Sequence, residues 1–345
     1  MKSTFINFFL TSLLLFGTGL SSCGQNELSE LIPEDQISAI CIWDKSPHCA
    51  FTDLVEYNGK VYCCFREAFA HVPYSASEFG SIRILESTDG EVWESIGTIS
   101  DSNYDLRDPK LSITPDGRLM LLYGRYLPGI TEPHHWTMVK IISDDEITNR
   151  QLDTRDSQEI SIENNPGLST YWLWRVKWLG NQAYGVAYKN GELPILVKST
   201  DGINYTLVAV LDALGNEADV ELLPDGRMLI VMRAQDGDGF VGYSHPPYNK
   251  WDWHNTSTLI HCPAILTLYG TTYIAGRSSW GTMLFTLQDN DIHPYALLPI
   301  SGGDNAYPGI IYRDSQIWIS YYGTSDAGIS IFLSKIEIKS QVNEQ

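Results

Sequence analysis

Arginines and carboxylates recur at comparable places along the sequence, each beside an apolar stretch. The arginines are Arg66, Arg107, Arg125, Arg175, Arg233 and Arg277. The carboxylates are Glu67, Asp108, Glu217, Asp219 and Asp304. In a chain with only 23 Lys and Arg residues, this placement predicts a charged funnel that binds a polar or anionic ligand. The alternative is that these side chains pair with one another and tie neighbouring structural units together.

Proton transfer has three candidates near the first two of these arginines: Glu67, His71 and Asp108. An imidazole suits the task because its ordinary pKa lies near neutrality. Two carboxylates about 5 to 10 Å apart would suit hydrolysis of a glycosidic bond. We therefore expect Arg66 and these three residues to reach a ligand.

Metal chemistry is not indicated by the spacing of the histidines. His48, His134, His135 and His261 form no His-x-x-His pair and have no carboxylate at a matching interval. Structural and catalytic zinc sites usually show such spacing. The sequence thus predicts neither a metal site nor a cofactor.

The cysteines include one at the N-terminal end, Cys23, and five others at Cys41, Cys49, Cys63, Cys64 and Cys262. An odd number leaves at least one thiol unpaired or paired with another chain. Adjacent residues of a strand point to opposite faces, so we expect Cys63 and Cys64 to be separately buried. A Cys41–Cys49 or Cys49–Cys63 bridge would be possible in an oxidising compartment.

The elements that must position these residues form a repeat. Each copy has a polar or aromatic entry, an apolar strand, a turn, and a second apolar strand that ends in a polar residue. The copies span residues 48–66, 107–125, 174–189, 217–233, 261–277 and 306–322. Their starts lie 59, 67, 43, 44 and 45 residues apart, and a β-propeller blade takes about 40 to 45 residues.

The repeat predicts an all-β fold, a six-bladed β-propeller with four-stranded antiparallel blades. Turn pairs such as Asn58-Gly59 and Asp225-Gly226 indicate hairpins. After the last copy the chain has one more strand, at residues 329–338, so we expect residues 37–43 to complete that blade and close the ring. A five-bladed ring and a β-sandwich are the alternatives.

The N-terminus predicts export. Lys2 precedes an apolar stretch from Phe5 to Leu20, which is the pattern of a signal peptide. Small residues before Cys23 resemble a bacterial lipoprotein signal, with acyl chains on that cysteine. The alternative is an ordinary secretory signal followed by a chance cysteine. We expect a signal at 1–22, an acidic tether at 23–36 and one propeller domain at 37–345, anchored in the bacterial envelope, at the outer membrane or cell surface.

Composition narrows the ligand class. The chain has 10 Trp, 19 Tyr and 11 Phe among 345 residues, and a formal net charge of −19. Such a charge repels nucleic-acid backbones, so nucleic acid is not an expected partner. The many aromatic rings suit an all-β protein with stacking surfaces.

Two hairpin segments carry a resemblance to a known family. Ser87-Thr-Asp-Gly-Glu-Val-Trp93 and Ser199-Thr-Asp-Gly-Ile-Asn-Tyr205 resemble the Asp box, or BNR repeat, of the sialidase superfamily. The Asp and Gly serve the turn and the aromatic ring packs into the blade. Segments 65–67 and 106–111 are similar to those of a branch of sialidase-like bacterial lipoproteins. The resemblance implies a six-bladed propeller.

Two further segments resemble sialidase motifs that carry chemistry. Residues 216–233 are similar to the segment that supplies a glutamate and an arginine, and residues 301–309 to the one that supplies the nucleophilic tyrosine. The resemblance implies Tyr307 as nucleophile, Glu217 as its base and Arg233 as a ligand for a substrate anion. Arg277 would be a further member of that anion clamp.

The sequence also departs from the sialidase pattern. The first repeat begins at His48 without the arginine that holds the sialic acid carboxylate, and residues 66–78 contain no aspartate to act as general acid. Glu67, His71 or Asp108 would then donate the proton. We therefore expect a sialidase-like glycoside hydrolase, exo-acting on an acidic or deoxy sugar rather than ordinary sialic acid. A polysaccharide lyase acting on uronate-containing glycans and a non-catalytic glycan-binding propeller are the alternatives.

Overall fold

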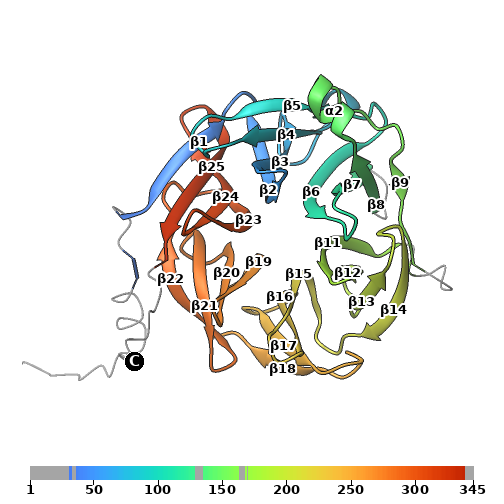
Figure 1. The fold of residues 1–345 in the computed structure, drawn as a ribbon, viewed down its shortest axis with the longest axis vertical. Helices are drawn as coiled ribbons and strands as arrows, with labels where there is room; N and C mark the ends of the chain where they lie inside the picture. Colours follow the sequence, from blue (N-terminus) through green and yellow to red (C-terminus); the bar gives the residue numbers. More distant parts are fainter. Residues whose placement is uncertain (1–30, 33–35, 129–134, 163–167, 169, 339–345) are drawn as a thin grey trace, which may run out of the picture.

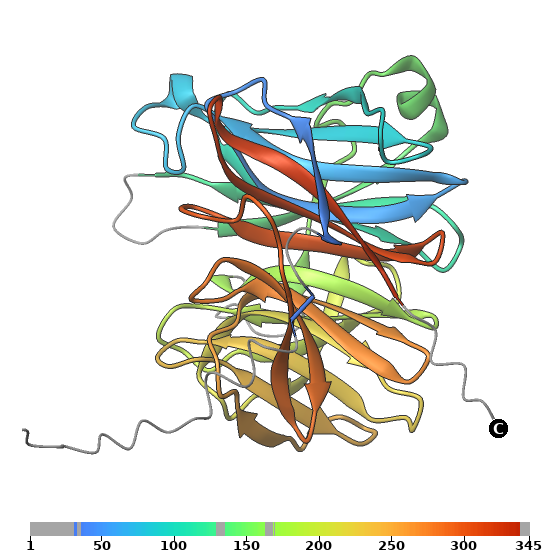
Figure 2. The same ribbon diagram turned by 90° about the vertical axis from the view of Figure 1, so that its left-hand side faces the viewer.

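The computed structural model describes residues 31–32, 36–128, 135–162, 168 and 170–338. Its architecture is all-β and propeller-like, with sheets arranged in a ring around a central axis (Figure 1). Seen from the side, the loop that follows residue 68 projects from one end of the ring (Figure 2). The sequence-based expectations for residues 1–30, including the signal and Cys23, lie outside the described residues.

The largest sheet has eight strands and combines the two ends of the described chain. Its order is β23-β24-β25-β2-β3-β4-β5, and β1 also pairs with β25. The strands are β1 (Ser38–Trp43), β2 (His48–Tyr57), β3 (Lys60–Ala68), β4 (Ser81–Ser87), β5 (Glu94–Ile99), β23 (Ala306–Arg313), β24 (Gln316–Ser325) and β25 (Gly328–Glu337). A single pair of residues, His48 and Ile329, joins β2 to β25.

Three sheets have four strands each. One contains β6 (Asp105–Ile113), β7 (Leu119–Tyr126), β8 (His135–Ile142) and β9 (Gln158–Glu159). Another contains β15 (Gly215–Leu222), β16 (Met228–Ala234), β17 (Phe240–Ser244) and β18 (Asp252–Asn255). The third contains β19 (His261–Leu268), β20 (Thr271–Arg277), β21 (Thr282–Gln288) and β22 (Asp291–Leu297).

The remaining sheet has five strands: β10 (Ser161–Ile162), β11 (Trp172–Leu179), β12 (Gln182–Tyr188), β13 (Ile195–Ser199) and β14 (Asn204–Val210). The strand β10 pairs with β14 in parallel, which explains the extra member. The described residues include two short helical elements, the 3-10 turn η3 (Ala76–Glu78) and the helix α2 (Asp144–Asn149). A capping box formed by Ser143 and Glu146 starts α2.

The hydrogen-bonded sheets therefore differ from the expected set of six four-stranded units. The difference has two local causes, the His48–Ile329 pair between β2 and β25 and the short parallel strand β10. The strand β1 lies within residues 37–43, where the sequence predicts a strand, and it pairs antiparallel with β25.

The strands β2, β6, β11, β15, β19 and β23 lie innermost in the ring (Figure 1). Each begins with a shift in its register against the next strand, at Ala50/Asp53, Arg107/Lys110, Leu173/Arg175, Gly215/Ala218, His261/Ala264 and Ala306/Gly309. Four of these irregularities contain, between the two paired residues that bound them, a non-glycine residue with positive φ, namely Phe51 (62°), Asp108 (49°), Cys262 (47°) and Tyr307 (46°). We call these six irregular starts the inner bulges.

The two Ser-x-Asp-Gly segments form closely similar turns between outer strands. Gly90 N donates to Ser87 Oγ at 2.8 Å, and Gly202 N donates to Ser199 Oγ at 2.9 Å. The carboxylate of Asp89 or Asp201 accepts from the two amides that follow each glycine.

Apolar clusters between neighbouring sheets form the core. On β3, Cys64 packs with residues of β6 to β8, while Cys63 packs on the other face with residues of β24 and β25. The expected separation of these two thiols is confirmed. The considered bridges are absent, because all five described cysteines are free thiols. Within the described residues no helix has the length and apolar character needed to cross a membrane.

Candidate functional site

The inner bulges bring side chains from separate sheets into contact around Tyr307. The ring of Tyr307 lies 4.8 Å from that of Phe51 and 6.1 Å from that of Trp174, measured between centroids. Its backbone N–H donates to the sulfur of Cys262 at 3.3 Å. A residue in the left-handed region costs on the order of 1–3 kcal/mol, so the surrounding packing must hold these conformations.

Tyr307 and Glu217 form the central polar pair. The phenol of Tyr307 donates a short hydrogen bond to Oε1 of Glu217. The other carboxylate oxygen accepts from Arg233 Nη1 at 3.3 Å and from the backbone N–H of Cys262 at 3.1 Å. Burial raises the pKa of Tyr307 well above its ordinary value, and the charge of Glu217 adds to this effect. The phenol is therefore protonated at rest, and its proton is directed at a carboxylate that can accept it.

Asp108 occupies the equivalent bulge in the second sheet. Its carboxylate accepts a hydrogen bond from Trp174 Nε1 at 3.4 Å, and Arg107 Nε lies 4.0 Å away. Burial raises the pKa of Asp108 above the usual value; nearby cations oppose this, while Glu217 adds to it. A buried carboxyl with a raised pKa has the property required of a general acid.

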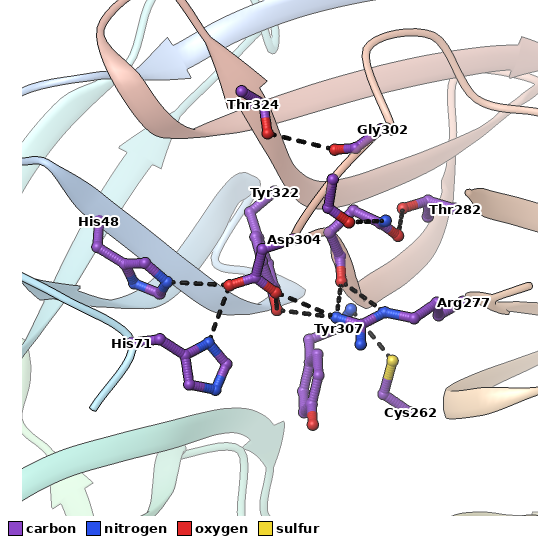
Figure 3. Close-up of polar contacts among 12 residues, drawn as sticks. His48, His71, Cys262, Arg277, Thr282, Gly302, Asp304, Tyr307, Tyr322 and Thr324 are labelled. Carbon is purple, nitrogen blue, oxygen red and sulfur yellow. Dashed lines mark hydrogen bonds and ion pairs between the residues drawn. The ribbon is translucent and has the colours of Figure 1, made fainter. Parts of the chain in front are cut away.

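Asp304 lies beside this group, in the loop before β23, and accepts hydrogen bonds from four side chains (Figure 3). Oδ2 is 3.1 Å from His48 Nε2 and 2.9 Å from His71 Nδ1. Oδ1 accepts from Tyr322 Oη at 3.0 Å and from Arg277 Nη2 at 3.3 Å. Burial alone would raise the pKa of Asp304, but the bonds with His48 and His71 hold it far below its usual range.

Arg277 links the Asp304 group to Tyr307. Its guanidinium lies 5.8 Å from the centre of the Tyr307 ring and also donates to the backbone oxygen of Asn305. Across the bulge of β19, His261 is half-buried, and burial together with Arg233 lowers its pKa to about 4. This imidazole is therefore neutral near pH 7, so the cationic groups beside Tyr307 are Arg233 and Arg277.

Arg107 lies at the edge of the cluster. It donates from Nη2 to the backbone oxygen of His71 at 2.9 Å, and its guanidinium faces the ring of Phe51 at 5.4 Å. Arg125 lies farther along, over the ring of Tyr104 at 4.6 Å. Arg107 therefore connects the loop carrying His71 to the second sheet.

Three of the residues expected at the site are instead engaged in other contacts. Glu67 accepts from Trp43 Nε1 at 2.9 Å and from Arg83 Nε at 2.7 Å. Arg66 is fully buried and donates to Asp105 at 2.7 Å. These contacts correspond to the alternative in which charged pairs tie neighbouring elements together.

Arg175 is the third of these residues. It is buried, with Nη1 3.0 Å from Asp53 and Nη2 donating to the backbone oxygen of Pro308 at 2.9 Å. Asp219 likewise accepts from the backbone N–H of Ile265 at 2.8 Å. Both residues connect inner strands of different sheets below the bulges.

Sequence reasoning missed Phe51, Trp174, Cys262 and Tyr322 as parts of this site. A signal for the bulges was nonetheless present, because proline follows three of the four strained residues that we identified: Asp108-Pro109, Cys262-Pro263 and Tyr307-Pro308. His134 lies outside the described residues. His135 stacks between the rings of Tyr126 and Trp172, and it is not part of the group of possible metal ligands found among the described residues.

Comparison with known proteins gives similarity at the level of structure. No family model matches the sequence, and no curated protein matches it. A protein of unknown function from Dyadobacter fermentans DSM 18053 has a TM-score of 0.71 and 16% identity, over 89% of this chain and 100% of that one.

Two enzymes are also similar. An α-L-arabinofuranosidase from Fusarium graminearum, solved with an iminosugar inhibitor, has a TM-score of 0.64 and 14% identity, over 87% of this chain and 97% of that one. A Trypanosoma rangeli sialidase in complex with sialic acid has a TM-score of 0.58 and 12% identity, over 88% of this chain. The match spans 59% of that sialidase. At identities this low, the TM-scores show a shared fold alone, the propeller that this chain has in common with the sialidase and the α-L-arabinofuranosidase.

Proposed function

We propose that this protein is a glycoside hydrolase that removes an acidic or deoxy sugar from the end of a glycan outside the cytoplasm. The observation that carries the proposal is the hydrogen bond from the Tyr307 phenol to Glu217, between Arg233 and Arg277. A phenol with a raised pKa is a poor nucleophile unless a base takes its proton as it attacks. The carboxylate of Glu217 is in place to do so.

In the first step the Tyr307 oxygen bonds to the anomeric carbon while its proton passes to Glu217. The glycosidic carbon–oxygen bond breaks, and Asp108 gives a proton to the departing oxygen. In the second step Asp108, now a carboxylate, takes a proton from water as the water oxygen bonds to the anomeric carbon. The bond between that carbon and the Tyr307 oxygen breaks, and Glu217 returns its proton to the phenolate. Configuration is retained because two displacements occur.

Arg233 and Arg277 would bind an anionic group of the sugar. Both guanidiniums are partly exposed, with side-chain accessibilities of 33% and 27%. Their described hydrogen bonds leave from Nη1 of Arg233 and from Nε and Nη2 of Arg277, out of the five N–H donors that each guanidinium has. Arg107 is a third candidate ligand for the anionic group, because its guanidinium lies at the edge of the cluster and donates to the backbone oxygen of His71. An acidic substituent on the terminal sugar fits two guanidiniums better than a neutral one does.

We also propose that the ring comprises six blades and that β1 closes it. The eight-stranded sheet divides naturally at the lone His48–Ile329 pair, and β1 would then be the outer strand of the blade formed by β23 to β25.

Residues 1–22 would be a signal, Cys23 a lipid anchor and residues 23–36 a tether. Labelling cells with a fatty-acid analogue tests the anchor: Cys23→Ser should abolish labelling, and retained labelling would contradict it.

The activity is tested by incubating the purified protein with plant and host polysaccharides and analysing released products by mass spectrometry. A monosaccharide released by the wild type, and lost in Tyr307→Phe and Glu217→Gln, supports the proposal. Products that absorb as unsaturated uronates would instead identify a lyase. Glycan binding without turnover would identify a binding module.

A further inference from the structure

The group around Asp304 contains three possible metal ligands that the proposed reaction does not use. His48 begins β2, His71 belongs to the loop after β3, and Asp304 precedes β23. Imidazole nitrogen and carboxylate oxygen are the donor set of many catalytic zinc sites. The three residues come from positions far apart in the chain, which is why histidine spacing predicted no site.

The donor atoms already converge. His48 Nε2 and His71 Nδ1 lie 3.1 and 2.9 Å from the same Asp304 oxygen, Oδ2, and all three donor atoms lie within 4.8 Å of one another. Zinc takes such atoms at about 2.0–2.2 Å, so tetrahedral neighbours stand about 3.3 Å apart. Small side-chain shifts would therefore admit an ion.

Outer contacts orient these ligands. Oδ1 of Asp304 is held by the Tyr322 hydroxyl at 3.0 Å and Arg277 at 3.3 Å, leaving Oδ2 for an ion. The ring of His71 packs edge-on against His48 and Phe51, at 5.3 and 5.2 Å between centroids. Such outer contacts commonly fix the ligands of a metal site. Nδ1 of the buried His48 has no hydrogen-bond partner among the described residues. This observation does not favour either account of Nε2, because Nδ1 would be in the same position with Asp304 or with an ion as the partner of Nε2.

The site is open on one side. The side chain of His48 is 8% exposed and that of His71 is 48% exposed, so solvent reaches the group from the His71 side. We propose that His48, His71 and Asp304 bind a divalent transition-metal ion of the zinc class, with an open coordination position beside Tyr307. The competing account is that the three side chains only tie the first and last inner strands together.

The test is a calorimetric titration of chelator-treated protein with zinc chloride, carried out in the absence of any glycan. A Cys41→Ser background removes an exposed thiol that would also bind zinc. We expect saturable 1:1 binding, weakened at least 10-fold in His71→Gln and in Asp304→Asn. His254→Gln is the matched control, because His254 pairs with a single carboxylate, Asp252, at 3.4 Å.

Cobalt provides a second readout that does not depend on activity. Cobalt(II) added to the same protein should give tetrahedral ligand-field bands without a thiolate charge-transfer band, and His71→Gln should lose them. Absent saturable binding, or binding unchanged by both His71→Gln and Asp304→Asn, would overturn the site. Because no glycan is present, either result leaves the hydrolase proposal to be judged separately.

Discussion

Two recurring features of this molecule, the Ser-x-Asp-Gly turns and the inner bulges, use polar groups in opposite ways. In each turn the serine and aspartate satisfy the amides of their own segment, within three residues. At the inner bulges, Tyr307, Glu217 and Cys262 satisfy one another across three sheets. Self-contained features of the first kind stabilise a fold, whereas features of the second kind gather reactive groups at one place.

The largest expected effect is on the central pair. Glu217→Gln should lower kcat by on the order of 10²–10⁴-fold, the usual contribution of a positioned proton-transfer group, and Tyr307→Phe by at least as much. Each variant loses about one hydrogen bond, so the free energy of unfolding should fall by only about 1 kcal/mol. Kinetics on the released sugar, together with urea denaturation, checks both numbers. Activity within 10-fold of wild type in either variant would contradict the mechanism.

A smaller loss is expected at Asp108. Asp108→Asn should lower kcat by on the order of 10²-fold, because the leaving oxygen no longer receives a proton. Asparagine tolerates a positive φ, so the bulge should survive and circular dichroism should be unchanged. The raised pKa keeps wild-type Asp108 protonated to a higher pH than an ordinary aspartate, and activity falls as pH rises through that pKa. The variant should lack this alkaline limb in its pH profile.

The turns should respond in stability and not in catalysis. Gly90 has a φ of 75°, and a Cβ there would lie 2.5 Å from the ring of Trp318. Gly90→Ala should therefore cost about 2–4 kcal/mol, through backbone strain and overpacking. Gly202→Ala is the matched comparison: φ is 76°, but the nearest atom is the flexible thioether of Met120 at 2.9 Å, and we expect about 1–2 kcal/mol. Equal losses measured by denaturation would show that packing at the two turns does not differ.

The smallest effect concerns the carboxylate of one turn. Burial alone would raise the pKa of Asp201, but hydrogen bonds led by the Asn204 amide lower it to about 2. Stability from this group is therefore present above the unfolded pKa, near 4, and lost as pH falls toward 2. Because Asp201 is exposed, Asp201→Asn should cost no more than about 1 kcal/mol at pH 7, with a smaller difference at pH 2. A cost that grows as the pH falls would contradict this sign.

The same comparison explains what the sequence could predict. The turns were recognisable because their chemistry lies within seven consecutive residues, such as Ser87 to Trp93, and each strand follows from local apolar patterning. That Tyr307 and Glu217 act together was predicted only through the resemblance to sialidases. Nothing local indicated that Glu67 bonds with Arg83 or that Arg175 bonds with Asp53. The first pair depends on how β3 and β4 align within one sheet, and the second on which sheet lies beside β11.

The group at Asp304 illustrates the same limit. His71 follows His48 by 23 residues, and Asp304 follows His71 by 233 residues. The eight-stranded sheet, which joins the first and last strands of the described chain, brings them together next to the bulge at Tyr307. The sequence therefore supplied the residue types but not their meeting point.

The central claim is that Tyr307 attacks the sugar with Glu217 as its base. Once the released sugar is known, its 2-fluoro glycosyl fluoride should trap the covalent intermediate, and peptide mapping by mass spectrometry will locate the label. We predict one label per protein molecule, on the Tyr307 oxygen. A label on the carboxylate of Glu217 or Asp108, or hydrolysis with inversion and no label, would contradict the account.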